Sequence, residues 1–523
     1  MSAPMGFLKA VVPWTNLKSP SASNYGYLRD AKVMMRTKAV LLGLCLLPAL
    51  LPAVAQVNRA NPSAGSNNSN SNDQGTTPDT IQAQPFSLDQ FNGSGRTDAL
   101  VPGVIKLSVL DAIERGLKHN LGLLLSQQQA EGARAQHLRN LSALLPNVSV
   151  RSSETLQQIN LAAFGIPFTV NGSTIVGPFA IFDVRPVMTE RLLDFAAINR
   201  LRSASENEKA ANLTAQDARE LVVLVVGNQY LLTLAAAARV ETAKAQFATA
   251  QAIFLQTQDL KKAGVVAGID VLRAQVQMQQ QQQSVLSTQN QLAKQRMALA
   301  RTIGLPMTQL YELTDSVPYA PLPEMNLEEA LARAYTRRPE YLAAEARVRA
   351  AEMQVKAAHG EALPTLDLNG DYGVIGPAPG SSRQTYSVAA GVRVPVFQGG
   401  KVKADVLQAQ SNLNQLKSQL SDLRSRVEFE VRSAMLDVKT SDEQVQVATQ
   451  SVDLAGQELK QARDRYASGV SGSLEVVQAQ EAVAVANETY IQSLYLNNVA
   501  KLSLARALGV AEQQTRAFLA GGK

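Results

Sequence analysis

The stretch that decides the fold runs from Gly400 to Ala467: GKVKADVLQAQSNLNQLKSQLSDLRSRVEFEVRSAMLDVKTSDEQVQVATQSVDLAGQELKQARDRYA. It contains no proline, and Gly456 is its only internal glycine, so nothing in it ends a helix. Apolar or small residues recur at alternating steps of four and three, which indicates helices packed along their length. This seam begins with Val402, Val406, Ala409, Leu413, Leu416, Leu420, Leu423 and Val427. At about 1.5 Å per residue the helix would be roughly 100 Å long, far too long for an ordinary globular core.

The chain of 523 residues is also an internal duplication. Residues 107–113 align with 325–331, and the same register brings Leu144-Leu145-Pro146 onto Ala362-Leu363-Pro364. After a change of 13 in the register, residues 262–265 align with 467–470. Each half therefore predicts one helix, two strands, a long helix, a turn and a returning helix.

Helix lengths in the first half support this organisation. The first helix (108–145) and the returning helix (270–301) total 70 residues, against 67 for the long helix (196–262). In the second half the corresponding helices are 326–363, 474–508 and 400–467. Two shorter helices stacked end to end would match one long helix, which favours a cylinder of uniform height.

The clearest strands are Thr365–Val374 and Thr385–Val396, in which apolar residues alternate with polar or small ones. Their length suits a tilted strand that crosses a bilayer. Val148–Ser153 and Phe179–Val187 show the same pattern less cleanly, with a loop over 161–178. Four strands cannot close a barrel, and open edges are not tolerated in lipid. We therefore expect a homotrimer, in which three copies supply twelve strands.

The N-terminal residues look like an export signal. Met34-Met35-Arg36-Thr37-Lys38 precedes an apolar run that closes at Ala53-Val54-Ala55, so translation from Met34 or Met35 and cleavage after Ala55 are expected. Cleavage there removes Cys45, the only cysteine, whose surroundings match a lipoprotein signal poorly. The first 55 residues hold six basic side chains and one acid, which leaves 44 basic and 43 acidic ones. Charge thus gives no support to nucleic-acid binding. No later apolar run approaches the length of a membrane-spanning helix.

The predicted domain organisation follows from the duplication and from these ends. It consists of an upstream extension and signal peptide (1–55), a flexible leader (56–104), the first repeat (105–310), an inter-repeat linker (311–324), the second repeat (325–512) and a C-terminal tail (513–523).

The duplication, the Leu-Pro helix ends, Val396-Phe397-Gln398-Gly399-Gly400 before a helix and the Gly-Val turns resemble the TolC-like outer-membrane efflux protein family over residues 105–512. The resemblance implies a mainly α fold with a membrane β-barrel: long hairpins form a periplasmic α-barrel, below a trimeric 12-stranded outer-membrane β-barrel. It implies a passive exit duct in the outer membrane of a Gram-negative bacterium, embedded in outer-membrane lipid and extending into the periplasm. The partners would be a periplasmic adaptor and a proton-driven or ABC-type inner-membrane pump, and the cargo drugs, toxic small molecules or metal ions.

Two alternatives stay open at this point. Within the family, the duct could serve a type I protein secretion system. In a different class, the chain could be a trimeric coiled-coil spacer or adhesin without a pore. The paired strands of membrane length argue against the spacer.

The resemblance also assigns residues to roles. The family's pore gate falls on Asp270, Tyr466 and Glu475, with Tyr466 donating a hydrogen bond to Asp270, while a second family latch, an arginine, falls on Ser471 and would be missing. The acids would narrow the pore and concentrate cations. The simpler interpretation of both acids is capping of the first helical turn, and Tyr466 could be a core residue. The adaptor-docking tips are Gly264, Val265, Gly469 and Val470, and the helix–strand transitions are Pro146, Pro364, Gly399 and Gly400.

No enzyme is expected from this sequence. His119, His137 and His359 are scattered without partners at metal-ligand spacing. No phosphate-binding glycine loop and no nucleophile elbow occurs. We therefore predict no cofactor and no metal site.

Overall fold

A computed structural model of the chain describes residues 88–520, except 96, 167, 170–171, 316–318 and 323–324, and except the side chains of 88, 516, 517, 519 and 520. Contacts divide the chain into residues 1–82 and 83–523, and every described residue belongs to the second unit. The predicted upstream extension, signal peptide and first part of the leader therefore lie outside the described residues.

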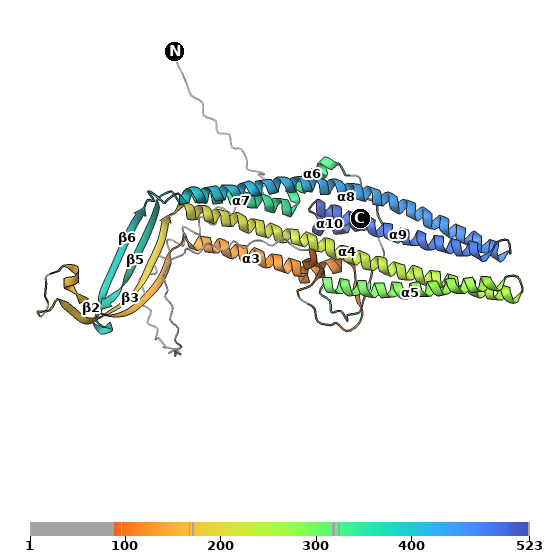
Figure 1. The fold of residues 1–523 in the computed structure, drawn as a ribbon, viewed down its shortest axis with the longest axis horizontal. Coiled ribbons are helices and arrows are strands. Elements are labelled where there is room, and N and C mark those ends of the chain that lie inside the picture. Colours follow the sequence, from red (N-terminus) through yellow and green to blue (C-terminus); the bar gives the residue numbers. More distant parts are fainter. Residues whose placement is uncertain are drawn as a thin grey trace, which may run out of the picture. The chain divides into compact units, whose positions relative to one another are not determined.

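Two long helices, α4 (Phe195–Lys262) and α8 (Lys401–Ala467), extend through the described unit (Figure 1). Each reverses at a short turn into a helix of 35 residues, α5 (Gly268–Thr302) or α9 (Ser473–Ala507). The prediction of an uninterrupted helix after Gly400 is confirmed. In α4 a stretch is long and apolar enough to cross a membrane by length and composition, but 56% of it is buried inside the fold.

The ascending helix of each repeat is broken, which corrects the prediction of single helices over 108–145 and 326–363. In the first repeat α2 (Val109–His119) and α3 (Leu121–Ser142) meet at Asn120, whose side chain accepts hydrogen bonds from the N–H groups of Gly122 and Leu123. In the second, α6 (Leu327–Arg337) and α7 (Pro339–Gly360) meet at Arg338. In the second repeat the break is explained by Pro339, the first residue of α7, which cannot donate a helical hydrogen bond and holds Arg338 in an extended conformation. Asn120 and Arg338 are equivalent positions of the two repeats.

The helices lie side by side in a fixed order. α4 packs against α3 and α5 on the one hand and against α7 and α9 on the other, and α8 packs against α7 and α9. Figure 1 shows α3 and α5 following one another along α4, and α7 and α9 doing the same along α8. This is the end-to-end stacking that the helix lengths predict. α3 and α5 thus lie at one edge of the helical layer and α8 at the other.

Four antiparallel strands form one sheet in the order β2-β3-β5-β6. They are β2 (Asn147–Asn160), β3 (Ile175–Leu193), β5 (Thr365–Gly376) and β6 (Arg383–Arg393), with a short helical turn η3 (Pro379–Ser381) between the last two. β2 and β3 are much longer than the predicted segments 148–153 and 179–187, and a turn η2 (Leu161–Phe164) lies in the predicted loop 161–178. β6 ends at Arg393, three residues before the predicted end.

The segments predicted as leader, linker and C-terminal tail each contain ordered elements. The end of the leader contains η1 (Leu88–Asn92) and β1 (Ile105–Leu107), and β1 pairs in parallel with β4 (Tyr311–Leu313) of the predicted linker. The predicted tail forms α10 (Ala511–Ala520), which packs against α4 and α9. Hydrogen bonds and buried side chains that the sequence pattern does not display hold these segments in place.

The main apolar core lies around the two helix breaks. It includes Phe91, Leu107, Leu299 and Leu508, all at most 1% exposed, and Tyr230 of α4, whose hydroxyl donates hydrogen bonds to the Leu107 carbonyl (3.0 Å) and to Asp315 (2.7 Å). This core therefore joins the N-terminal segment, the linker and both repeats.

Candidate functional site

The wall formed by the sheet has one exposed apolar face. The register pairs Leu366 with Val392 and Tyr372 with Tyr386, so that the apolar residues predicted to point one way share a face. Tyr386 and Val392 are 77% and 68% exposed. Large apolar side chains exposed along one face of a sheet match the lipid-facing alternation of membrane strands.

The opposite face carries charge. Arg185 of β3 donates hydrogen bonds to Asp183 (2.7 Å) and to Asp371 of β5 (3.0 Å), so that a salt bridge links the two central strands. Such alternation of an apolar and a charged face is typical of a wall between lipid and water.

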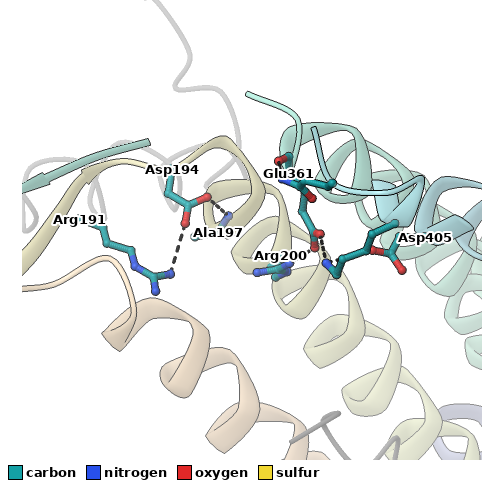
Figure 2. A network of polar contacts seen from close by, with 8 residues as sticks. Arg191, Asp194, Ala197, Arg200, Glu361 and Asp405 are labelled. Carbon is teal, nitrogen blue, oxygen red and sulfur yellow. Dashed lines mark hydrogen bonds and ion pairs between the residues drawn. The ribbon is translucent and has the colours of Figure 1, made fainter. Parts of the chain in front are cut away.

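A polar network fixes the joint between the sheet and α4 (Figure 2). Asp194, at 6% exposure, caps α4 by accepting a hydrogen bond from the Ala197 N–H (2.8 Å), and Arg191 of β3 reaches the same carboxylate at 3.3 Å. An aspartate in this position satisfies N–H groups that the first helical turn leaves without partners. These two contacts fix the direction of β3 relative to the axis of α4.

A second bridge in the same region joins three helices. Glu361, just after α7, binds Arg200 of α4 and Lys401 of α8, and Lys401 also lies 3.2 Å from Asp405 (Figure 2). Hydrogen bonding to Glu361 raises the pKa of Lys401 above its ordinary value. These contacts hold the tops of the two long helices at a defined separation.

The four predicted transition residues all lie at this joint. Pro146 and Pro364 directly precede β2 and β5. Gly399 and Gly400 have φ of +59° and +84°, and Gly400 is the N-cap of α8. A left-handed conformation at two successive residues favours glycine, which explains the Gly-Gly pair. The role of these residues in the junction remains a prediction.

At the far end of the hairpins the two turns share one geometry. Gly264 and Gly469 have φ of +75° and +70°, and the Val265 and Val470 N–H groups donate to the carbonyls of Leu260 and Arg465 at 2.9 and 3.0 Å. This is the glycine-terminated helix end in which a six-residue turn satisfies the last carbonyls. Val265 and Val470 are 60% and 71% exposed, so each turn presents an apolar side chain outwards.

The predicted gate residues gather at the same end but pair differently from the resemblance. Tyr466 is 5% exposed in an apolar cluster with Ile253 of α4 and Val476 of α9. Its hydroxyl lies 3.2 Å from the Thr257 hydroxyl, so the hydrogen bond expected with Asp270 is replaced by one across the α4–α8 seam. The reason is position: Tyr466 points into the seam, whereas Asp270 lies in the first turn of α5.

Asp270 instead ties the two hairpins together. Its carboxylate accepts a hydrogen bond from the Ser473 hydroxyl of α9 (2.7 Å) and lies 3.6 Å from Arg273. Glu475 pairs with Arg465 of α8 at 3.4 Å. The two predicted acids therefore each have an arginine nearby, which weakens the expectation that they concentrate cations. The Ser471 hydroxyl is buried without a hydrogen-bond partner among the described residues.

The predicted gate residues have three partners that the sequence pattern does not reveal: Thr257, Ser473 and Arg465. Ser473 directly precedes the predicted returning helix 474–508, and Arg465 is adjacent to Tyr466. Neither position distinguishes these residues from other polar residues in the sequence. Sequence analysis also missed a buried ionic group at the second helix break. There Arg338, 2% exposed, bonds Glu340 at 2.9 Å and Glu430 at 2.5 Å.

No group of three or more His, Cys, Asp and Glu side chains with the spacing of a metal site occurs in the part of the chain that the structure describes. His119 and His137 lie apart from each other, near Asp98 and Glu208 respectively. The arrangement instead suits a wall and a conduit, with polar links at both ends of the hairpins.

A strand wall that continues into long helical hairpins with Gly-Val turns defines the class of TolC-like outer-membrane channels. The family model described as "Outer membrane efflux protein" matches residues 330–510. The outer membrane protein OprJ of Pseudomonas aeruginosa is 23% identical over 421 residues, which cover 78% of this chain and 85% of OprJ. The pyoverdine export outer membrane protein OpmQ of Pseudomonas putida is 24% identical over 315 residues, covering 59% of this chain and 66% of OpmQ.

The crystal structure of the outer membrane protein VceC from Vibrio cholerae aligns with a TM-score of 0.65 at 18% identity, and covers 77% of this chain and 96% of VceC. The second repeat thus matches the outer membrane efflux protein family model, and the whole chain is similar to outer-membrane efflux proteins and shares their fold. These relatives are named as outer-membrane and efflux proteins and none as an enzyme, in agreement with the class and the location that the sequence predicts.

Proposed function

We propose that the protein works as a homotrimeric channel-tunnel, the passive exit duct of a tripartite efflux system. The observation that carries this proposal is the sheet with two open edges. β2 and β6 each pair with one neighbour only, and the sheet has an exposed apolar face. Unpaired backbone groups in hydrocarbon cost several kcal/mol each, about the strength of a hydrogen bond in an apolar medium. Three copies joined edge to edge leave no edge open.

The helices support the same assembly. Five large apolar side chains of α8 are 63–72% exposed and fall at spacings that keep them on one face of the helix. They are Leu407, Phe429, Leu436, Val447 and Leu454. α5, at the opposite edge of the helical layer, exposes a second stripe with Leu272, Val276 and Leu286 at 53–62%. In a ring, the edge bearing α8 meets the edge bearing α3 and α5 of the next copy, which covers both stripes.

The turns at Gly264 and Gly469 supply the docking end. Each presents an exposed valine on a backbone of the same conformation, so a trimer displays six similar tips. We propose that a periplasmic adaptor binds these tips and links the duct to a proton-driven or ABC-type inner-membrane pump. The gate would lie just inside, at Asp270, Tyr466 and Glu475.

Small toxic molecules or metal ions are the proposed cargo. Relatives carry names that refer to the export of pyoverdine and to the efflux of antibiotics and toluene. The channel itself contributes little selection in this proposal, because the pump supplies energy and chooses the cargo.

The test uses the purified full-length protein in detergent and in planar bilayers. We expect trimers that survive in SDS without heating and stepwise ionic currents after reconstitution. A matched pair of variants tests the α8 stripe. Leu436→Glu should prevent trimer formation, whereas Lys460→Glu, an exposed position of α8 on another face of the helix, should not. A monomer without currents would refute the proposal.

A further inference from the structure

The longest uncharged run of the chain lies at the end of the sheet away from the helices. Residues 155–182 comprise 28 positions without Asp, Glu, Lys, Arg or His, between Glu154 and Asp183, although 18% of the chain is charged. The run contains the ends of β2 and β3 and the turn η2 between them. The second repeat has no counterpart, because a short turn joins β5 and β6.

This part of the β2–β3 hairpin projects beyond the rest of the sheet. Pairing of β3 with β5 stops at Phe182 and Gly376, whereas β2 and β3 remain paired as far as Asn160 and Ile175. We call the described part of this projection, residues 155–166 and 172–181, the outer ribbon. At about 3.3 Å per residue its seven β3 positions beyond the pairing with β5, 175–181, extend roughly 20 Å past the four-stranded wall.

The end of the outer ribbon is an ordered turn. The Leu161 N–H donates to the Thr174 carbonyl (2.8 Å), the Ile166 N–H donates to the Leu161 carbonyl (3.2 Å), and the Asn160 side chain accepts from the Ala162 N–H (3.1 Å). On this framework Phe164 is 72% exposed and Ile166 45%. The backbone thus holds large apolar side chains outwards at a fixed place.

In the proposed wall, neither lipid nor the other described strands cover these side chains. β5 and β6 have 12 and 11 residues, already the length of a tilted membrane-spanning strand, so the outer ribbon begins where the hydrocarbon ends. β5 pairs with β3 only as far as Gly376 and Phe182, so neither β5 nor β6 continues alongside the outer ribbon. A contiguous apolar surface left in water is a liability that proteins bury in an interface.

A second and third copy of the same ribbon fit what remains. Around a threefold axis each residue approaches its own copies, and a charged residue there would face like charge, which is destabilising. A run without any charge avoids this repulsion, and exposed phenylalanine and isoleucine gain by covering one another.

We propose that the outer ribbons of three copies pack on one another through Phe164 and Ile166 and narrow the outer mouth of the channel. This inference rests on the proposed trimer and adds a constriction at the end opposite to the predicted gate. Its action is steric and apolar, so it would slow charged and hydrated solutes most.

Cross-linking tests the contact in the full chain. In a Cys45→Ser background, Phe164→Cys supplies one thiol per mature chain, and Ala163→Cys is a second reporter if that variant assembles poorly. We expect a short bifunctional thiol reagent to link Phe164→Cys trimers. We expect no links for Ser387→Cys in the middle of β6, because three strands of the barrel wall lie between each Ser387 and its equivalent in the next copy. Trimers that are heat-resistant yet unlinked at both 163 and 164 would overturn the inference.

Conductance tests the constriction. Phe164→Ser combined with Ile166→Ser should raise single-channel conductance about twofold or more if the mouth limits the current. Phe397→Ser is the control, because Phe397 is 89% exposed but lies at the other end of the wall, and it should leave the conductance unchanged.

Two further results separate the possible failures. A fluorophore on Phe164→Cys that is quenched by brominated lipid would show that the ribbon inserts into the membrane, which overturns the contact between copies. Absence of trimers and of wild-type currents would refute the proposed duct itself. Wild-type currents with an unchanged double variant would refute only the constriction.

Discussion

Ser473→Ala should open the periplasmic end of the channel. The Ser473 hydroxyl donates to the Asp270 carboxylate at 2.7 Å and so ties α9 to α5, the returning helices of the two hairpins. Hydrogen bonds to charged groups contribute about 1.5–3 kcal/mol each. The Asp270 side chain is 19% exposed, so we take about 1 kcal/mol per chain and about 3 kcal/mol for three chains. If the tie exists only in the closed state, this shifts the closed-to-open ratio about a hundredfold.

The assay is open probability in planar bilayers, together with the uptake of a large antibiotic that intact outer membranes exclude. Arg273→Gln is the matched control, because its guanidinium lies 3.6 Å from the same carboxylate on a side chain 53% exposed, and exposed pairs contribute little. Asp270→Asn and the double variant complete a cycle, in which the two changes should be strongly non-additive. Unchanged open probability, or strict additivity, would contradict the assignment of this tie to the closed state.

Three other expectations concern the gate, the joint between the sheet and the helices, and the buried carboxyl group of Glu220. Tyr466→Phe should raise conductance and antibiotic leakage, because it removes the 3.2 Å contact with Thr257 at a cost of about 0.5–1.5 kcal/mol per chain. Unaltered currents would count against a role of Tyr466 in holding the channel closed. Gly360→Ala should destabilise the fold by about 1–3 kcal/mol, since the added Cβ would lie 2.8 Å from the backbone of α4. Gly132→Ala, with open space around it, should stabilise the fold by up to about 1 kcal/mol. Chemical denaturation of both variants measures the two free-energy changes. Burial raises the pKa of Glu220 from 4.5 to about 7. The protonated side chain therefore contributes stability that is fully present below pH 4.5 and lost as the pH rises through 7. Thermal melts should show this loss in the wild type, and Glu220→Gln should make the melting temperature less dependent on pH in this range.

The sequence was sufficient for the long helices, the turns and the sheet. Seams with steps of four and three persist through residues 400–467, and no residue competes with the helix, so α8 was predicted within a residue of its start. The alternation in β6 predicted its exposed face, because register in a paired strand has a period of two. Repetition made these inferences stronger, since each element could be checked against its equivalent.

Features that depend on contacts between distant segments could not be predicted. Asn120 sits in a helical pattern, and only the structure places the Phe91 carbonyl against its side chain at 2.6 Å. β1 and β4 are three residues each, too short for a periodic signal, and they pair across about 200 positions of sequence. The contact of Tyr466 is a further example: the resemblance implies a hydrogen bond to Asp270, whereas the structure places the Thr257 hydroxyl 3.2 Å from the Tyr466 hydroxyl.

The two open edges of the sheet also have a consequence for how the protein is made. β2 offers 14 residues and β6 offers 11, and each is complementary to the other rather than to itself. In the proposed ring, a complex of two chains still has one unpaired β2 edge and one unpaired β6 edge. Only a third chain, which closes the ring, pairs both of them. Trimer assembly should therefore depend steeply on the concentration of chains. A variant that is blocked at one edge should have a dominant-negative effect on co-expressed normal subunits.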